Sequence, residues 1–274
     1  MRYYHYFCAK FVTLEVLNLQ KIFNTHPGVN AILSLLKEQQ PNIFLKGLSG
    51  SSEALVVSSV FEKNENNLLC ILNDEEDAGY FFHDCCQSLG DQNVLFFPSG
   101  YKRNIRYGQK DSANEILRTE VLGRILDDQE PLIIITYPEA LAEKVVSGDA
   151  LSKKTLKIAV GEQVDSLFVS DVLESYGFEW VDYVYEPGQY AVRGSLIDVF
   201  SFSNEYPYRI DFFGNEVESI RSFDIESQLS KEKLEQIDII SANTGQTDAT
   251  LFSYLQKEDT VLFRNENWVY EKIS

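Results

Sequence analysis

The first part of the chain alternates between two apolar patterns. Val29, Ile32, Leu33 and Leu36 recur at the spacing that places side chains on one face of a helix. Short, nearly continuous apolar runs are instead typical of strands buried on both faces of a parallel sheet. Such strands are expected at residues 42–47, 68–72, 94–97 and 132–136, and further helices at 54–60, 75–89 and from 112 onward. Strands that alternate with helices predict an α/β domain.

The pattern changes after about residue 147 to a region dense in strands. A strand at 156–160 and a helix at 166–176 are followed by runs rich in aromatic and β-branched residues, at 180–185, 190–200, 208–213 and 217–223. Glu186-Pro187-Gly188 suits a tight turn, and Gly214-Asn215 between two strands is a hairpin signal. This region predicts a smaller α+β domain.

The last fifty residues return to the first kind of pattern. A strand is expected at 236–240 and a helix at 248–256, and the segment is expected to rejoin the first sheet. The predicted division is therefore 1–146 for the first domain, with an N-terminal extension at 1–25, then 147–224 for the inserted α+β domain and 225–274 for the return segment.

A Gly/Ser loop follows the first expected strand, where a phosphate-binding loop joins strand to helix in P-loop folds. That motif begins with a glycine, here Gly47, and after four residues, Gly50 among them, continues with glycine, lysine and a hydroxyl residue. Ser52, Glu53 and Ala54 stand at those three positions. A carboxylate repels the triphosphate where the motif needs a cation. On the loop alone, a plain strand-to-helix connection is the favoured interpretation.

These features together predict the fold class. It is α/β, with a parallel-sheet domain and an inserted smaller α+β domain. The net charge argues against direct binding of nucleic acid, because a formal net charge of −18 over 274 residues repels phosphates. Only a local basic patch would allow direct DNA binding.

No metal or cofactor is expected. The four cysteines lack Cys-x-x-Cys spacing and the three histidines are scattered; they are Cys8, Cys70, Cys85 and Cys86, and His5, His26 and His83. The acidic run at residues 74–77 is expected to start a helix, with a metal site as the alternative. The sequence has no signal-peptide pattern and no segment of membrane-spanning length, so a cytoplasmic protein is expected.

Two stretches carry a resemblance to known families. Residues 185–200 read YEPGQYAVRGSLIDVF, and residues 208–224 read YRIDFFGNEVESIRSFD. In order and spacing they resemble stretches shared by bacterial transcription-repair coupling factors and by UvrB, the helicase-like subunit of the bacterial excision nuclease. UvrB proteins keep an intact phosphate-binding motif, whereas coupling factors have a degenerate one in this region. Glu53 and Ala54 therefore make the chain more similar to the coupling factors. The resemblance implies that the sheet domain is a degenerate P-loop NTPase-like or helicase-like domain.

The resemblance implies a function and a set of contact residues. It implies a non-enzymatic module that recruits UvrA, the damage-sensing ATPase of nucleotide-excision repair, to stalled RNA polymerase. Arg193, Arg209 and Phe213 match the family's UvrA contacts. In the full-length protein, an ATP-dependent DNA translocase, a C-terminal domain would mask the same surface, and other domains would contact RNA polymerase and DNA.

The residues themselves are compatible with an interface at the same place, although the pattern alone favours internal ion pairs and only the resemblance shifts the balance to an interface. Along 208–213, strand alternation places Arg209 and Phe213 on one face and the apolar residues of the run on the other. An arginine beside an aromatic residue is typical of interface hot spots. Arginine also persists where the sequence is otherwise acidic, since 158–230 contains no lysine and only Arg193, Arg209 and Arg221. Because the guanidinium group of arginine binds carboxylates through paired N–H groups, these arginines are expected to recognise carboxylates.

Several alternatives remain open at this point. The arginines could pair internally with Asp198, Asp211 or Glu218, Arg221 being the candidate for a local salt bridge, and Phe213 could be buried if both faces of the sheet are covered. An ATP-dependent helicase half, or a fragment of the UvrB-like subunit, is the enzymatic alternative. A DNA-binding module is the third.

Overall fold

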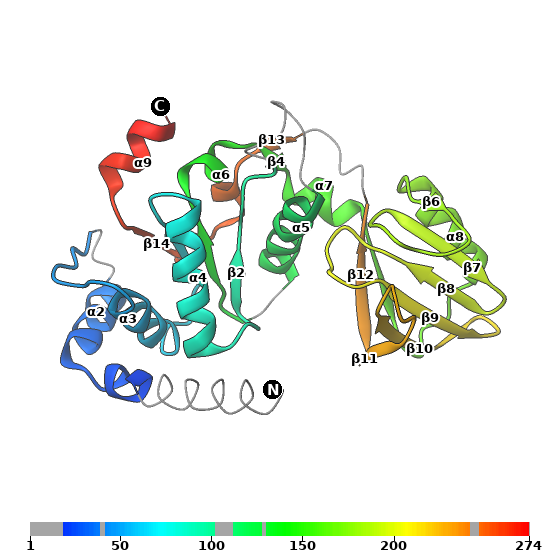
Figure 1. The fold of residues 1–274 in the computed structure, drawn as a ribbon, viewed down its shortest axis with the longest axis horizontal. Helices are drawn as coiled ribbons and strands as arrows, with labels where there is room; N and C mark the ends of the chain where they lie inside the picture. Colours follow the sequence, from blue (N-terminus) through cyan, green and yellow to red (C-terminus); the bar gives the residue numbers. More distant parts are fainter. Residues whose placement is uncertain (1–18, 39–41, 102–111, 128–129, 242–246, 274) are drawn as a thin grey trace, which may run out of the picture. The chain divides into compact units, whose positions relative to one another are not determined.

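The computed structural model describes residues 19–38, 42–101, 112–127, 130–241 and 247–273. Residues 1–18 of the expected N-terminal extension, with His5 and Cys8, lie outside the described residues. The chain divides into two compact units, each described here by itself (Figure 1). The first contains Met1–Pro98, Asp128–Ala142 and Leu255–Ser274, and the second Ser99–Asp127 and Glu143–Tyr254.

The first unit is built on a four-stranded parallel sheet in the order β14-β1-β3-β2. Its central strands are buried at every position because helices and neighbouring strands surround them. The strands are β1 (Leu68–Ile71), β2 (Val94–Phe96), β3 (Ile133–Thr136) and β14 (Thr260–Phe263), and the helices are α2 (Pro27–Lys37), α3 (Ser52–Phe61), α4 (Glu75–Leu89), α6 (Pro138–Ala142) and α9 (Glu266–Ile273). The α/β class predicted from the sequence is confirmed.

The acidic run at 74–77 starts α4, as expected. The Asp74 carboxylate accepts a hydrogen bond from the Asp77 backbone N–H at 2.9 Å, which satisfies one of the free donors at the helix N-terminus. The following acidic residues lie in the first turn, where negative charge opposes the positive end of the helix dipole.

The expected strand at 42–47 is absent. Residues 42–46 form no regular structure, and Phe44 is 79% exposed. The neighbours of β1 are β14 and β3, so no edge of β1 is free to pair with this run. A short apolar run shows that the local sequence is compatible with a strand. It does not show whether a partner strand is available for pairing.

The second unit is built on a six-stranded sheet in the order β11-β10-β9-β8-β7-β6. All neighbouring pairs are antiparallel except β6 with β7. The strands are β6 (Glu179–Trp180), β7 (Gln189–Arg193), β8 (Leu196–Val199), β9 (Tyr208–Phe213), β10 (Glu216–Phe223) and β11 (Ser230–Leu234). Gly214, at φ +63°, makes the two-residue turn of the predicted β9–β10 hairpin, where a left-handed backbone is needed.

Shorter elements complete the second unit. The two strands of each remaining pair are antiparallel: β5 (Thr155–Ala159) with β12 (Gln236–Ile240), and β4 (Val145–Val146) with β13 (Thr247–Ala249). The helices are α5 (Ser112–Asp127), α7 (Gly148–Lys153), α8 (Ser166–Ser175) and the 3-10 helix η1 (Leu251–Tyr254). The helix expected at 248–256 is therefore wrong. Leu251 and Tyr254 are both buried, and their spacing of three suits the tighter helix.

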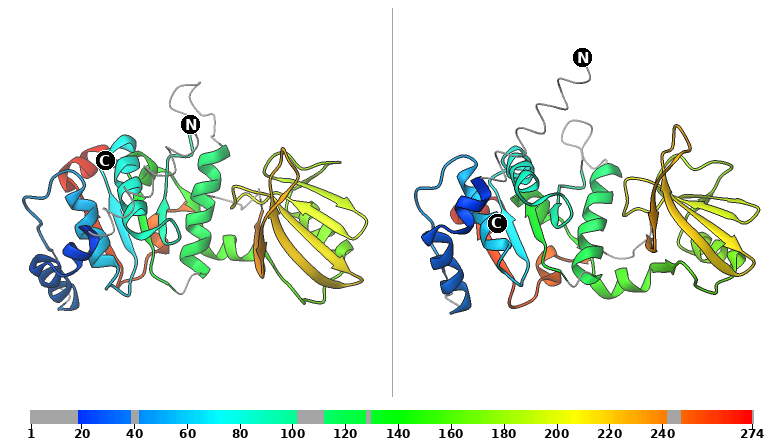
Figure 2. Two further views of the ribbon diagram at one scale, coloured as in Figure 1. Left: turned by 60° about the horizontal axis from the view of Figure 1, so that its bottom comes forward. Right: turned by 90° about the horizontal axis from the view of Figure 1, so that it is seen from below.

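One face of the six-stranded sheet forms the core of this unit. Ile210 and Phe212 of β9 lie on this face, and Val169 and Leu173 of α8 pack against it. Figure 2 shows the sheet and α8 from two further directions. Because strand residues alternate between faces, burial of this face leaves the intervening residues of β7 to β10 on the other one.

The expected strand at 180–185 is only two residues long, since β6 ends at Trp180. Beyond it, Val184 is buried with Ala191 and Phe200, and Val181 packs against the same cluster. The segment therefore folds over the second face of the sheet instead of pairing along its edge, and burial of these two valines is the physical reason.

Gly188 closes the predicted tight turn, and we expect its replacement to be destabilising. Its φ is +87°, and an added Cβ would lie 2.5 Å from Phe202 Cζ. Gly188→Ala should lower the free energy of unfolding by about 2 kcal/mol, from backbone strain and overpacking, as measured by urea denaturation. Gly161→Ala is the matched control, because Gly161 has φ +82° with open space around it. Equal losses in the two variants would contradict the overpacking.

Candidate protein-docking surface

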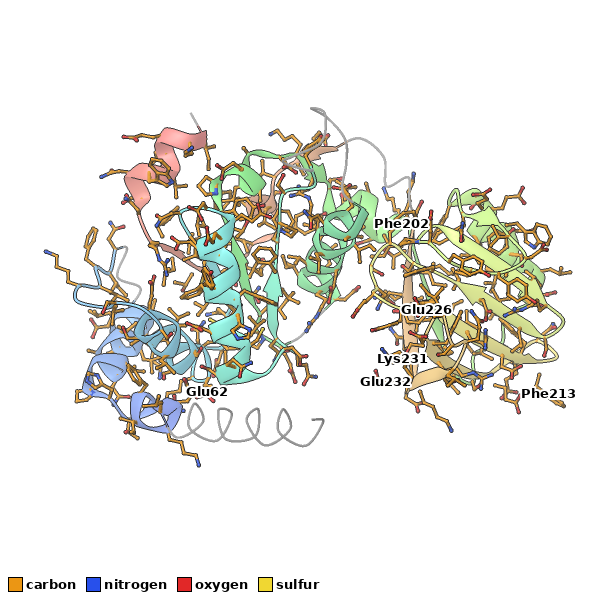
Figure 3. All side chains as sticks on the ribbon, viewed as in Figure 1. Glu62, Phe202, Phe213, Glu226, Lys231 and Glu232 are labelled. Carbon is orange, nitrogen blue, oxygen red and sulfur yellow. The ribbon has the colours of Figure 1, made fainter. Side chains whose placement is uncertain are left out.

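The predicted contact residues lie on the sheet face opposite α8. Along β9, Ile210 and Phe212 are buried, whereas Arg209 is partly buried and Phe213 is 77% exposed. The alternation predicted from the sequence is confirmed, and the alternative of a covered Phe213 is wrong. Figure 3 shows Phe213 at one end of the sheet, with its side chain directed away from the strands. We call the sheet face opposite α8 the outer face.

Two hairpin turns bring the predicted residues to one end of the outer face. In the register of β8 and β9, Leu196 pairs with Asp211. The Phe212 backbone N–H donates to the Ser195 carbonyl at 2.9 Å, so the β7–β8 turn lies beside the end of β9. Arg193 immediately precedes that turn and Phe213 immediately precedes the β9–β10 turn.

A buried carboxylate joins the two predicted arginines. Asp198 of β8 is only 1% exposed. Arg209 binds it with two hydrogen bonds, from Nε to Oδ1 at 2.7 Å and from Nη2 to Oδ2 at 2.8 Å. Arg193 Nη2 donates to the same Oδ2. One carboxylate therefore binds two guanidinium groups, that of Arg209 in the bidentate geometry that arginine favours and that of Arg193 through one nitrogen.

Aromatic rings flank this arrangement on both sides. The Arg209 guanidinium lies 4.3 Å from the centroid of the Phe223 ring, and that of Arg193 lies 5.0 Å from the centroid of the Tyr183 ring. Gln228, in the left-handed region at φ 59°, also accepts a hydrogen bond from Arg209 Nη2 at 3.0 Å. The hydrogen bond to Asp198 raises the pKa of Arg209 above its usual value, so the group stays charged.

Internal pairing, which the sequence left open, is thus found for both arginines. This pairing leaves the two arginine side chains exposed to different extents. The side chain of Arg193 remains 32% exposed, and that of Arg209 13%. A partner can reach more of Arg193, while Arg209 is held deeper in the face. Arg221 approaches Asp211 at 3.9 Å, which agrees with its expected role in a local salt bridge.

The expected phosphate loop has a different setting from the one predicted, because no strand precedes it. Gly47 and Gly50 have positive φ, and α3 begins at Ser52. The Ser52 hydroxyl accepts a hydrogen bond from the Ser49 N–H at 2.9 Å and donates one to its carbonyl at 2.7 Å. Ala54 is buried. The polar atoms of Ser52 are thus used within the loop.

Glu53 of this loop takes part in an internal ion network. Arg264, which follows β14, donates to Glu53 Oε2 from Nε at 3.1 Å and from Nη2 at 2.7 Å. Arg264 Nη1 also lies 3.0 Å from Asp77 Oδ2. Glu53 and Asp77 share one arginine, so the negative charge of Glu53 is balanced from within the first unit.

Metal-binding clusters, membrane-spanning helices and the state of the cysteines can be checked in the described residues. Across the described ranges, no cluster of three or more His, Cys, Asp or Glu side chains is arranged to hold a metal ion. Within the same part of the chain, no helix has both the length and the apolar character needed to cross a membrane. Cys70, Cys85 and Cys86 are free thiols, and burial raises the pKa of Cys85 to about 12.

Sequence reasoning missed two residues of the outer face. Gln228 follows β10, and its contact with Arg209 depends on a left-handed backbone that no local signal indicates. Tyr183 was assigned to a strand, although its neighbours Val181 and Val184 are spaced by three rather than two. That spacing was the signal against a strand with alternating faces.

In sequence, the second unit is similar to a family of interaction domains. The family described as the UvrB interaction domain matches residues 156–244, which include β6 to β12 and all but the first residue of β5. Arg193, Arg209 and Phe213, the predicted contact residues, lie within the match.

Most of the chain is similar to transcription-repair coupling factors, as the sequence predicted. It is 28% identical to that of Escherichia coli over 232 residues, which cover 83% of this chain and 20% of the relative. For Bacillus subtilis the identity is 26% over 222 residues, covering 81% and 19%. The predicted resemblance is confirmed, and the chain spans about a fifth of the length of the curated relatives it matches.

Proposed function

We propose that this chain is a non-enzymatic docking module that binds UvrA through the outer face. Arg193, Arg209 and Phe213 are the proposed contact residues. The observation that carries the proposal is the pairing of a partly exposed, pre-oriented Arg193 with an exposed Phe213 at the same end of the sheet. Arginine and aromatic residues are the usual anchors of protein interfaces.

The partner chemistry follows from the charges. Arginine forks recognise carboxylates, so the partner is expected to present acidic side chains to this end of the face and an apolar pocket to Phe213. The UvrB interaction domain match and the similarity to coupling factors support a role in transcription-coupled nucleotide-excision repair. In this role the module recruits UvrA to stalled RNA polymerase.

The proposal extends to the longer protein of which the relatives are examples. A C-terminal domain would mask the outer face, and other domains would contact RNA polymerase and DNA and supply the ATP-dependent motor. The division into a degenerate P-loop NTPase-like domain at 1–146, a UvrA-binding domain at 147–224 and a return segment at 225–274 is part of the same proposal.

The purified chain is expected to form a stable complex with UvrA from the same organism. The two proteins should co-elute on gel filtration, and calorimetric titration should give a single class of sites. Binding should weaken as salt rises, because charged groups at the rim of an interface are screened. Separate elution at micromolar concentrations of both proteins would contradict the proposal.

The enzymatic alternative is tested on the same sample. Titration with ATP and magnesium should give no heat of binding, because Glu53 stands where the motif needs a lysine and is already paired with Arg264. Micromolar affinity for ATP would favour a helicase half or a UvrB-like fragment instead.

A further inference from the structure

Tyr183 is an exposed aromatic residue next to the most accessible arginine of the outer face. It is 51% exposed, and the Arg193 guanidinium lies over its ring, 5.0 Å from the centroid. Arg193 Nη2 also binds Asp198. The guanidinium therefore contacts both a ring and a carboxylate, and part of the ring remains exposed.

The backbone around Tyr183 is fixed although it forms no regular element. The Val181 N–H donates to the Tyr190 carbonyl at 2.9 Å, and Val184, one residue after Tyr183, is only 1% exposed. The next two backbone N–H groups both donate to Gln189 Oε1, at 2.9 and 3.0 Å. Anchors on both sides hold the ring in place before any partner arrives, which lowers the entropy lost on binding.

The hydrogen-bonding capacity of Arg193 is only partly used. Among the residues that the structure describes, Asp198 receives a hydrogen bond from Nη2, while Nε and Nη1 have no hydrogen-bond acceptor. A guanidinium group has five N–H donors, so donors remain for a second carboxylate. A carboxylate side chain that bound there would bring its aliphatic stem close to the Tyr183 ring.

We propose that Tyr183 is a further contact residue of the UvrA-docking surface. Its ring packs against the stem of an acidic side chain of UvrA whose carboxylate binds the free N–H groups of Arg193. This inference rests on the proposed function and adds a residue from outside the strands to the strand residues already named. Tyr183 and Arg193 then act as one recognition unit.

The test is a set of affinity measurements with UvrA. Tyr183→Ala is expected to weaken binding by about tenfold, as loss of an aromatic and cation–π contact does. Tyr183→Phe keeps the ring and should stay within about twofold of the wild type. Tyr185→Ala is the matched control, since Tyr185 is 59% exposed in the same segment and makes no ring contact with Arg193 within the described residues.

A double-mutant cycle separates contact from folding. In the Arg193→Ala background, Tyr183→Ala should weaken binding by much less than tenfold, because the two residues bind the same group. The urea midpoint of Tyr183→Ala should match that of the wild type. Wild-type affinity of Tyr183→Ala, with Arg193→Ala still impaired, would overturn the inference alone. Wild-type affinity of both variants would also remove Arg193 from the proposed docking surface.

Discussion

Arg193→Glu is expected to weaken the complex with UvrA by a factor of about 100, as the loss of a charged hot-spot residue does. The variant removes the donors offered to the partner's carboxylate and places a negative charge in front of it. The side chain of Arg193 is partly exposed, so the loss should appear in calorimetric titration of UvrA as both lower affinity and weaker salt dependence.

Two further variants make this result specific. Lys257→Glu makes the same change in net charge at an exposed position of the first unit and should bind UvrA as the wild type does. Arg193→Ala avoids placing a carboxylate beside Asp198 and should still weaken binding by more than about fivefold. If Arg193→Glu and Lys257→Glu had equal affinities, the outer face would not be the docking surface.

Asp198→Asn is expected to lower the free energy of unfolding by about 3 kcal/mol. Asp198 is almost fully buried, and Arg209 beside it is only slightly exposed. Loss of the carboxylate charge leaves a largely buried guanidinium without its counterion, and this is more costly than the loss of an exposed pair. Urea denaturation followed by circular dichroism measures the change.

Asp211→Asn is the matched control for this variant. Asp211 lies on the same face, is partly exposed, and approaches Arg221 at 3.9 Å. An ion pair of this kind contributes less than about 1 kcal/mol. A urea midpoint for Asp198→Asn that equals the midpoint for Asp211→Asn would show that Asp198 is not the shared counterion of the two arginines.

Local patterns predicted most elements of both units. The helix at 75–89 was predicted at its observed bounds, and the strands at 68–72 and 208–213 within a residue. Predictions failed where the outcome depended on distant partners. The run at 42–47 has no neighbouring strand, and residues 247–249 became a strand because β4 lies beside them. Neither partner is visible in a local window of sequence.

The sequence by itself determined which residues of β9 share a face. Side chains of a strand alternate, so Arg209 and Phe213 had to lie together, opposite Ile210 and Phe212. It also showed that a glutamate, Glu53, stands at the position where a phosphate-binding motif would require a lysine.

Only the tertiary structure decided how the two arginines differ. The register of β8 and β9 places Asp198 opposite Arg209, and the β7–β8 hairpin brings Arg193 to the same carboxylate. The segment before β7 adds Tyr183, and the segment after β10 adds Gln228. These contacts join residues that are far apart along the chain, and strand register and burial select them. Their effect is to leave Arg193 accessible while Arg209 is held within the face.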